Sequence, residues 1–103
     1  MADAWYSGSL TDLWVEYKYL DVTTPRNQVV PALTRQQLNW LQGRHGEGRS
    51  VWVVVGCKGG GVILETPEEF EHGLSAFEFM DRLKDRKGIA NAIQRFCNGE
   101  DNE

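Results

Sequence analysis

The run Val51-Trp52-Val53-Val54-Val55 limits the fold more than any other part of this sequence. It is short, β-branched and almost wholly apolar, without the alternation of a strand that has one face in water. Such a run is typical of a central strand buried in a sheet. The chain has 103 residues, which leaves little room for a second core. We therefore expect a single domain over residues 1–103, built around this strand.

Further strands are expected on both sides of the run in sequence. Ala4-Trp5-Tyr6 leads into Ser7-Gly8-Ser9, a turn signal, and residues 12–20 are rich in aromatic and β-branched side chains. These two segments predict a β-hairpin. Residues 21–31 hold two prolines and predict an irregular loop. Glycines 59–61 predict a turn, and Val62-Ile63-Leu64 a returning strand.

Four helix starts are expected. Thr34 with Gln37 forms a capping-box pattern, Thr66 precedes Pro67 and an acidic first turn, and Ser75 with Glu78 repeats the box. A last helix is expected from about residue 88. The apolar face of the helix that starts at residue 75 is predicted to comprise three side chains: Phe77, Met80 and Leu83.

The resulting order ββαββααα predicts an α/β fold with a small mixed β-sheet flanked by helices. We expect residues 1–64 to form the core that carries the motifs. Residues 65–97 are expected to be a helical C-terminal part, and residues 98–103 an acidic tail.

The net charge of −4 is distributed unevenly. Residues 1–64 carry six Lys/Arg and five Asp/Glu, whereas residues 65–103 carry five and ten. This balance argues against a protein whose affinity for nucleic acid depends on bulk positive charge. No apolar run approaches the ~20 residues that span a bilayer, and no signal peptide is recognisable. We expect no membrane partner and a cytoplasmic location.

Glu16 and Lys18 are the strongest candidates for chemistry. In a strand they share one face and lie about 7 Å apart. If the hairpin turns near Gly8, Asp3 lies opposite Trp14 or close to Glu16 on the neighbouring strand. Two carboxylates and a backbone carbonyl would bind Mg²⁺ or Mn²⁺. Such an ion activates water and stabilises charge on a scissile phosphate, and Lys18 is placed to assist.

The order of these motifs resembles the PD-(D/E)XK nuclease superfamily. Asp3, Glu16-x-Lys18, a helix opening Leu33-Thr34-Arg35-Gln36-Gln37-Leu38-Asn39-Trp40-Leu41 and the Val-rich strand look like its virus-type replication-repair branch. That branch (VRR-NUC) is akin to Holliday-junction resolvases and small bacteriophage nucleases. The resemblance covers roughly residues 3–64.

The resemblance implies a metal-dependent DNA endonuclease, in the host cytoplasm if the chain is viral. Asp3 and Glu16 would bind the metal, Lys18 would support the attacking water, and Gln37 would position water, lysine or phosphate. Two departures from the family pattern stand out: Ala2 replaces the usual Pro, and the family's N-terminal helix is missing. We expect either that a partner subunit supplies this helix or that this is a minimal or truncated version of the fold. Small nucleases of this type often work as dimers, so a homodimer is also expected.

Other interpretations remain open at this stage. Gln37 is equally explained as a helix cap, and both roles can hold at once. Arg35 and Gln36 at the same helix start are candidate phosphate contacts. Tryptophans are more often core than base-stacking residues, with Trp14 the exception because it shares the face of Glu16. The alternative function is a catalytically inactive binding protein on a nuclease scaffold, such as a viral inhibitor that docks on a host protein through its acidic helices.

Overall fold

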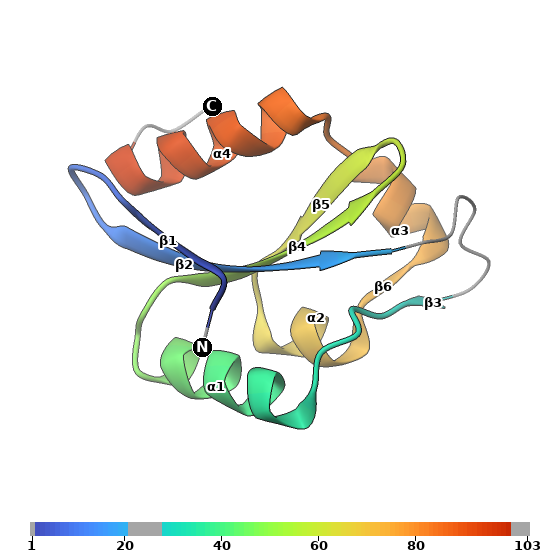
Figure 1. The fold of residues 1–103 in the computed structure, drawn as a ribbon, viewed down its shortest axis with the longest axis horizontal. Helices are drawn as coiled ribbons and strands as arrows, with labels where there is room; N and C mark the ends of the chain where they lie inside the picture. The colour runs from blue at the N-terminus through green and yellow to red at the C-terminus, as the bar shows by residue number, and fades with distance from the viewer. Residues whose placement is uncertain (1, 21–27, 100–103) are drawn as a thin grey trace.

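The protein is built on a four-stranded mixed sheet with helices on both faces (Figure 1). The computed structural model describes residues 2–20 and 28–99. The strand order is β1-β2-β4-β5; β2 and β4 are parallel, and the two outer pairs are antiparallel. The elements in chain order are β1 (Ala4–Ser7), β2 (Asp12–Tyr19), β3 (Gln28–Val29), α1 (Arg35–Gly46), β4 (Val51–Cys57), β5 (Gly60–Leu64), α2 (Pro67–His72), β6 (Leu74–Ser75), α3 (Ala76–Asp81) and α4 (Arg86–Asn98).

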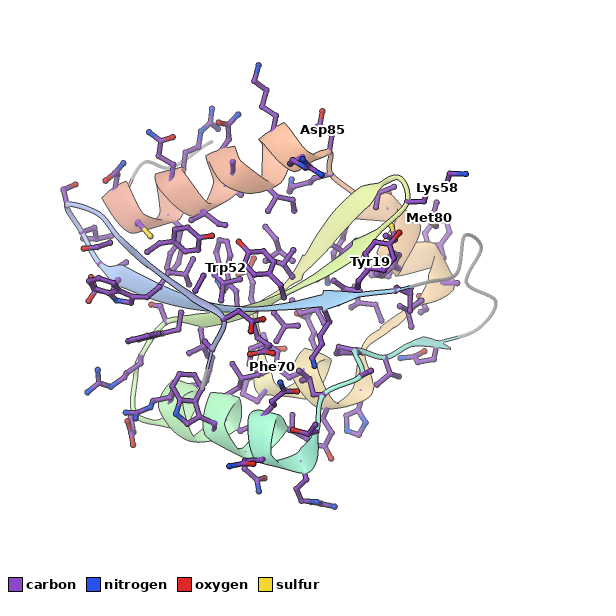
Figure 2. The ribbon with its side chains drawn as sticks, in the orientation of Figure 1. Tyr19, Trp52, Lys58, Phe70, Met80 and Asp85 are labelled. Atoms are coloured by element: carbon purple, nitrogen blue, oxygen red, sulfur yellow. The ribbon has the colours of Figure 1, made fainter. Side chains whose placement is uncertain are left out.

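The apolar run occupies β4, whose residues 51–55 are all buried. Its side chains alternate between two cores. Trp52 and Val54 pack under α4, while three valines of the same strand pack against α1, α2 and α3. Figure 2 shows Trp52 on the α4 side of the sheet and Phe70 of α2 on the other side. An α/β fold with a small mixed sheet flanked by helices is therefore confirmed.

The helix starts follow the expected caps. Thr34 accepts from the backbone N–H of Gln37, whose side chain accepts in return from the N–H of Thr34. Thr66 and Ser75 cap α2 and α3 through the N–H three residues later. The last helix begins two residues earlier than expected, because Asp85 provides its cap by accepting from the N–H of Gly88.

The structure also corrects parts of the expected order. Two short strands, β3 and β6, pair with each other as a second sheet. The first falls in the segment expected to be loop, of which residues 21–27 lie outside the described part. The second interrupts the segment 65–97, expected to be helical. Their paired residues are 45 and 47 positions apart in sequence, so no local pattern indicates the pairing.

The predicted apolar face of α3 is wrong for Phe77 and Met80, whereas Leu83, just after the helix, packs against the core as expected. Phe77 is 81% exposed and Met80 is more than half exposed, whereas Phe79 is buried in the core below the sheet. A helix of six residues has fewer than two turns, so periodicity defines its inner face poorly. Residues 98–99 are described, but the acidic part of the tail, 100–103, lies outside the described residues. No helix within residues 2–20 and 28–99 is long and apolar enough to cross a membrane.

Two glycines allow a test of how closely β3 packs against the end of α2. Gly73 has φ 71° and ψ −154°, and a Cβ there would collide with the backbone carbonyl of Val29 in β3. That backbone region is essentially restricted to glycine and costs other residues about 1–3 kcal/mol. Gly43 lies inside α1 with open space around it. We predict that Gly73→Ala lowers the free energy of unfolding by more than about 2 kcal/mol.

The matched substitution Gly43→Ala should instead raise the free energy of unfolding by up to about 1 kcal/mol, because alanine is the better helix former. Urea unfolding of both variants, followed by circular dichroism, measures the two changes. Equal stability of Gly73→Ala and the wild type would contradict the close approach of β3 to this glycine.

Candidate functional site

Glu16 is the one charged side chain that is buried among the described residues, with 2% of its surface exposed. It lies in β2 on the face that packs against α1, as the alternation of the strand predicts. Burying a carboxylate is costly unless hydrogen bonds or opposite charges compensate. The groups around Glu16 therefore define the chemistry that this part of the fold can support.

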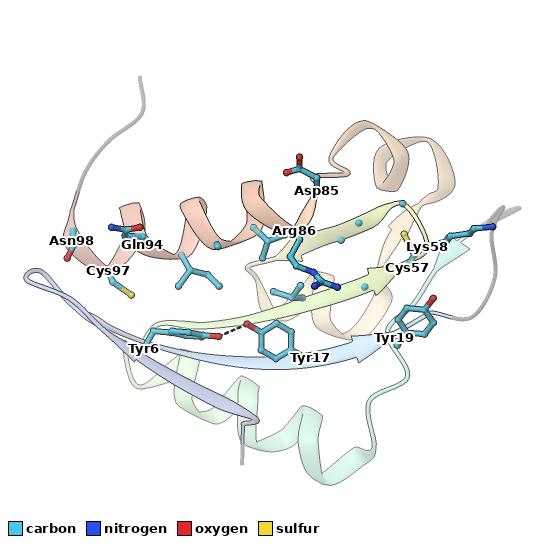
Figure 3. A pocket seen from close by; sticks show the side chains of 18 of the residues that line it. Tyr6, Tyr17, Tyr19, Cys57, Lys58, Asp85, Arg86, Gln94, Cys97 and Asn98 are labelled. Carbon is cyan, nitrogen blue, oxygen red and sulfur yellow. Dashed lines mark hydrogen bonds between the residues drawn. The ribbon is translucent and has the colours of Figure 1, made fainter.

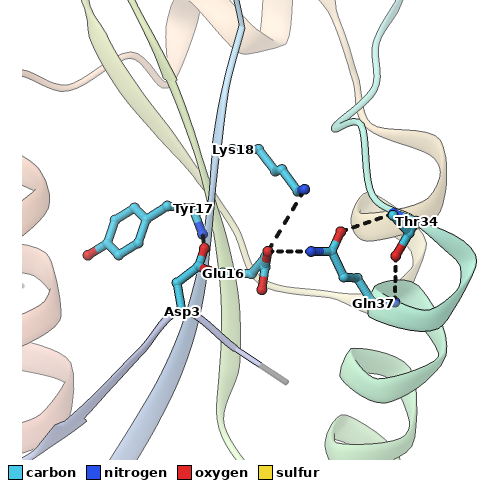
Figure 4. Close-up of polar contacts among 6 residues, drawn as sticks. All are labelled: Asp3, Glu16, Tyr17, Lys18, Thr34 and Gln37. Carbon is cyan, nitrogen blue, oxygen red and sulfur yellow. Dashed lines mark hydrogen bonds and ion pairs between the residues drawn. The ribbon is translucent and has the colours of Figure 1, made fainter.

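Gln37 at the start of α1 holds one oxygen of this carboxylate. Its Nε2 donates to Oε2 of Glu16 at 2.9 Å, while its Oε1 accepts from the N–H of Thr34 (Figure 4). The two contacts fix which end of the amide is the donor. Gln37 is thus both a helix cap and a partner of Glu16, and the two roles left open by the sequence coexist.

Lys18 and Asp3 approach the same carboxylate from other directions. Nζ of Lys18 lies 3.9 Å from Oε2 of Glu16, and 24% of the Lys18 side chain is exposed. Asp3 precedes β1, in which Ala4 pairs with Val15. The next step of that register places Asp3 beside Glu16. Of the two positions expected for Asp3, the one opposite Trp14 is wrong, because Trp5 occupies it.

Asp3 is anchored to the backbone of β2. Its Oδ2 accepts from the N–H of Tyr17 at 2.8 Å, so the carboxylate lies against the strand that carries Glu16 and Lys18 (Figure 4). Burial and the charge of Asp3 raise the pKa of Glu16, and Lys18 opposes them. The site is a cluster of two acids and one amine at the end of β2 where α1 begins.

Oε1 of Glu16 is buried and has no hydrogen-bond partner among the described residues. Buried polar atoms in native proteins nearly always have a hydrogen-bond partner. A buried oxygen without one therefore indicates a place for water or an ion. Within residues 2–20 and 28–99, no cluster of three or more His, Cys, Asp or Glu side chains could hold a metal ion. Any ion here would therefore need main-chain or water oxygens beside the two carboxylates.

The other expected site residues lie near this cluster but do not touch it. Arg35 and Gln36 are exposed in the first turn of α1, next to Gln37. Trp14 is half-buried between two other tryptophan rings, with centroids 5.9 Å from Trp5 and 6.0 Å from Trp40. Its faces are thereby largely used within the protein.

Trp5 is the residue that the sequence interpretation undervalued. It was expected in the core, yet 53% of its surface is exposed. Its position two residues after Asp3 was the signal that could have placed it beside the acids.

A cavity of about 820 Å³ lies on the opposite face of the sheet, between α4 and strands β2 and β4 (Figure 3). The hydroxyls of Tyr6 and Tyr17 share a hydrogen bond of 2.6 Å at its edge. Burial, followed by this bond, raises the pKa of Tyr17 well above its usual value. The side chain of Tyr17 thus faces the cavity while its N–H holds Asp3, so β2 separates the cavity from the acidic cluster.

The raised pKa of Glu16 predicts how stability depends on pH. A carboxyl whose folded pKa lies above its unfolded value stabilises the protein below the unfolded pKa, and this contribution is lost as pH rises through the folded pKa. Without divalent metal, Glu16→Gln should therefore raise the melting temperature at pH 8. The gain should shrink as the pH falls towards 4.5, the ordinary value for Glu.

Thermal unfolding in EDTA across this pH range measures the effect, with the exposed Glu68→Gln as the control. A variant that is less stable than the wild type at pH 8 would contradict the cost assigned to the buried charge.

Comparison with known proteins gives no relative from which a role could be transferred. No family model, curated protein or solved structure matches this chain. A functional assignment must therefore start from the residues around Glu16 and from their geometry.

Proposed function

We propose that this chain is a divalent-metal-dependent DNA endonuclease with a restriction-endonuclease-like core of the PD-(D/E)XK type. The observation that carries the proposal is the buried Glu16, which keeps Oε1 unpaired beside Asp3 while Gln37 and Lys18 hold Oε2. The oxygens of a purely structural buried carboxylate are nearly always paired, by protein groups or by water. An oxygen left open beside a second carboxylate is suited to a cation.

The residues fit Mg²⁺ or Mn²⁺. Both ions prefer oxygen ligands, and Mg²⁺ usually combines one or two carboxylates with water and substrate phosphate. Glu16 and Asp3 supply the carboxylates. In an extended strand the N–H and C=O of one residue point to the same side. The N–H of Tyr17 meets Asp3, so the carbonyl of Tyr17 faces the same edge and is the proposed main-chain ligand.

A bound divalent ion would supply Lewis acidity to the scissile phosphate and lower the pKa of the attacking water. The ammonium of Lys18, partly exposed beside Glu16, orients that water and stabilises negative charge that develops on the phosphate. Gln37 is a positioning residue, because its amide holds Oε2 of Glu16 and leaves Oε1 without a protein partner among the described residues. Asp3 keeps its place through the N–H of Tyr17.

DNA is the proposed partner, and its backbone would lie along the start of α1. Arg35 and Gln36 are exposed in the first turn of α1, two residues and one residue before Gln37. Helix N-termini favour anions, and no acidic residue occupies the first turn of α1. Local positive potential at this point compensates for the acidic overall charge. A homodimer remains part of the proposal, as a source of further DNA contacts.

We predict that Mg²⁺ or Mn²⁺ supports cleavage of DNA by this protein. Glu16→Gln or Lys18→Ala should lower the cleavage rate at least about 100-fold, which is the usual effect of losing an electrostatic catalytic group. The matched controls are Glu68→Gln in α2 and Lys87→Ala in α4, both at exposed positions outside β2. A gel assay on linear and branched DNA, with EDTA as the blank, measures the rates. Unchanged cleavage in both site variants would refute the assignment.

A catalytically inactive binding protein on the same scaffold is the alternative. The observation in its favour is that only two carboxylates meet at the site in the part of the chain described. We predict that isothermal titration calorimetry detects one Mn²⁺ per chain and that Asp3→Asn or Glu16→Gln abolishes the heat. Absence of Mn²⁺ binding by the wild type would support the binding protein instead. Asp12→Asn is the control, because Asp12 lies at the far end of β2.

A further inference from the structure

We propose that Trp5 is a stacking surface for an unpaired base next to the scissile phosphate, so that the substrate is a DNA strand with unpaired bases at the cleavage point. The inference rests on the proposed function, since the acidic cluster must lie at the phosphate for Trp5 to meet a neighbouring base. It adds the substrate class, which the residues around Glu16 leave open.

The position of Trp5 follows from the register of the hairpin. Trp5 pairs with Trp14, and cross-strand partners point to the same face of a sheet. Trp14 lies two residues before Glu16, so these side chains also share that face, about 7 Å apart along the strand. The indole of Trp5 is therefore next to the cluster formed by Asp3 and Glu16, on the same side of the sheet.

The indole is held in place from behind. Trp5 packs on Trp14 with centroids 5.9 Å apart and a tilt of 38°, and Trp14 meets Trp40 edge-on at 6.0 Å. The guanidinium of Arg44 lies 5.2 Å from the centre of the Trp40 ring. This ladder links β1 to α1 and leaves its last member, Trp5, 53% exposed. Because β1 is an edge strand of the sheet, no strand within residues 2–20 and 28–99 covers Trp5 from outside.

A nucleobase is the partner that best matches this surface. A single exposed aromatic side chain is ordinary by itself, but here the ring is preorganised beside groups suited to a phosphodiester. Every base has a π-face, and aromatic stacking is the usual way in which proteins hold single strands. In an intact duplex each base is already stacked and paired, and extruding it is costly. The geometry thus favours a DNA strand with unpaired bases over continuous duplex.

The test compares three Trp5 variants of the full chain in EDTA, where no cleavage occurs. Fluorescence anisotropy gives the affinity for a labelled single strand and for the duplex of the same sequence. Trp5→Phe keeps a π-face, whereas Trp5→Leu covers Trp14 without one, and Trp5→Ala exposes it. Tyr19→Leu is the control, because Tyr19 is an exposed aromatic of β2 on the opposite face of the sheet. Thermal melting checks that each variant is folded.

We expect the wild type to bind the single strand more tightly than the duplex. Trp5→Leu and Trp5→Ala should lose about fivefold to 100-fold in affinity for the single strand, which is the range for one stacked base. Trp5→Phe and Tyr19→Leu should stay within about threefold of the wild type, as expected when a stacking face is kept. Single-strand binding by Trp5→Leu equal to that of Trp5→Phe, or equal wild-type affinity for both DNAs, overturns the inference.

These outcomes are separable from failure of the proposed function. If cleavage depends on Glu16 but not on Trp5, and the protein shows no preference for unpaired DNA, the proposed substrate class is overturned and the nuclease assignment stands. Single-strand binding that depends on Trp5, in a protein that cleaves no DNA with Mg²⁺ or Mn²⁺, supports the stacking surface and refutes the nuclease. Lack of binding to either DNA in EDTA overturns the stacking surface, and lack of cleavage with Mg²⁺ or Mn²⁺ as well refutes both.

Discussion

The hydrogen bond from Gln37 to Glu16 is the contact on which the arrangement of the site depends. It joins the start of α1 to β2 and fixes one oxygen of a carboxylate that the core has almost fully enclosed. An apolar residue of similar size at position 16 would pack against α1 without a desolvation penalty, and such replacements are often neutral or stabilising. The raised pKa of Glu16 reflects that penalty. A buried acid that weakens the fold is the expected signature of a functional group.

The topology explains why the groups meet at this point. Strands β2 and β4 are parallel neighbours and α1 connects them, so α1 begins near the end of β2 that carries Glu16 and Lys18. Open α/β sheets place their binding sites at such carboxyl ends of parallel strands. The antiparallel strand β1 adds Asp3 from the other side through the N–H of Tyr17. Three segments that are separate in sequence thus converge at this point.

Much of this site could be predicted from local patterns. Alternation along β2 separates Glu16 and Lys18 from the tyrosines, and the capping box places Gln37 at the first turn of a helix. The exact partner of Asp3 needed the hairpin register, which depends on a loop whose geometry the sequence does not specify. The pairing of β3 with β6 and the inward turn of Phe79 depend on tertiary packing. Short elements carry too little periodicity to reveal such contacts.

Trp14 shows how one position can serve both the fold and the proposed chemistry. Its ring meets Trp40, which ties β2 to α1, and it also packs against Trp5 at the edge of the sheet. Since Trp14 and Glu16 share one face of β2, any slip in register that exposed the acid would also break the aromatic contacts. The same hairpin register therefore sets the distance between Glu16 and Trp5 and keeps the core packed. A rigid spacing of this kind suits a ligand with a charged group and a planar group held a fixed distance apart, as in a nucleotide.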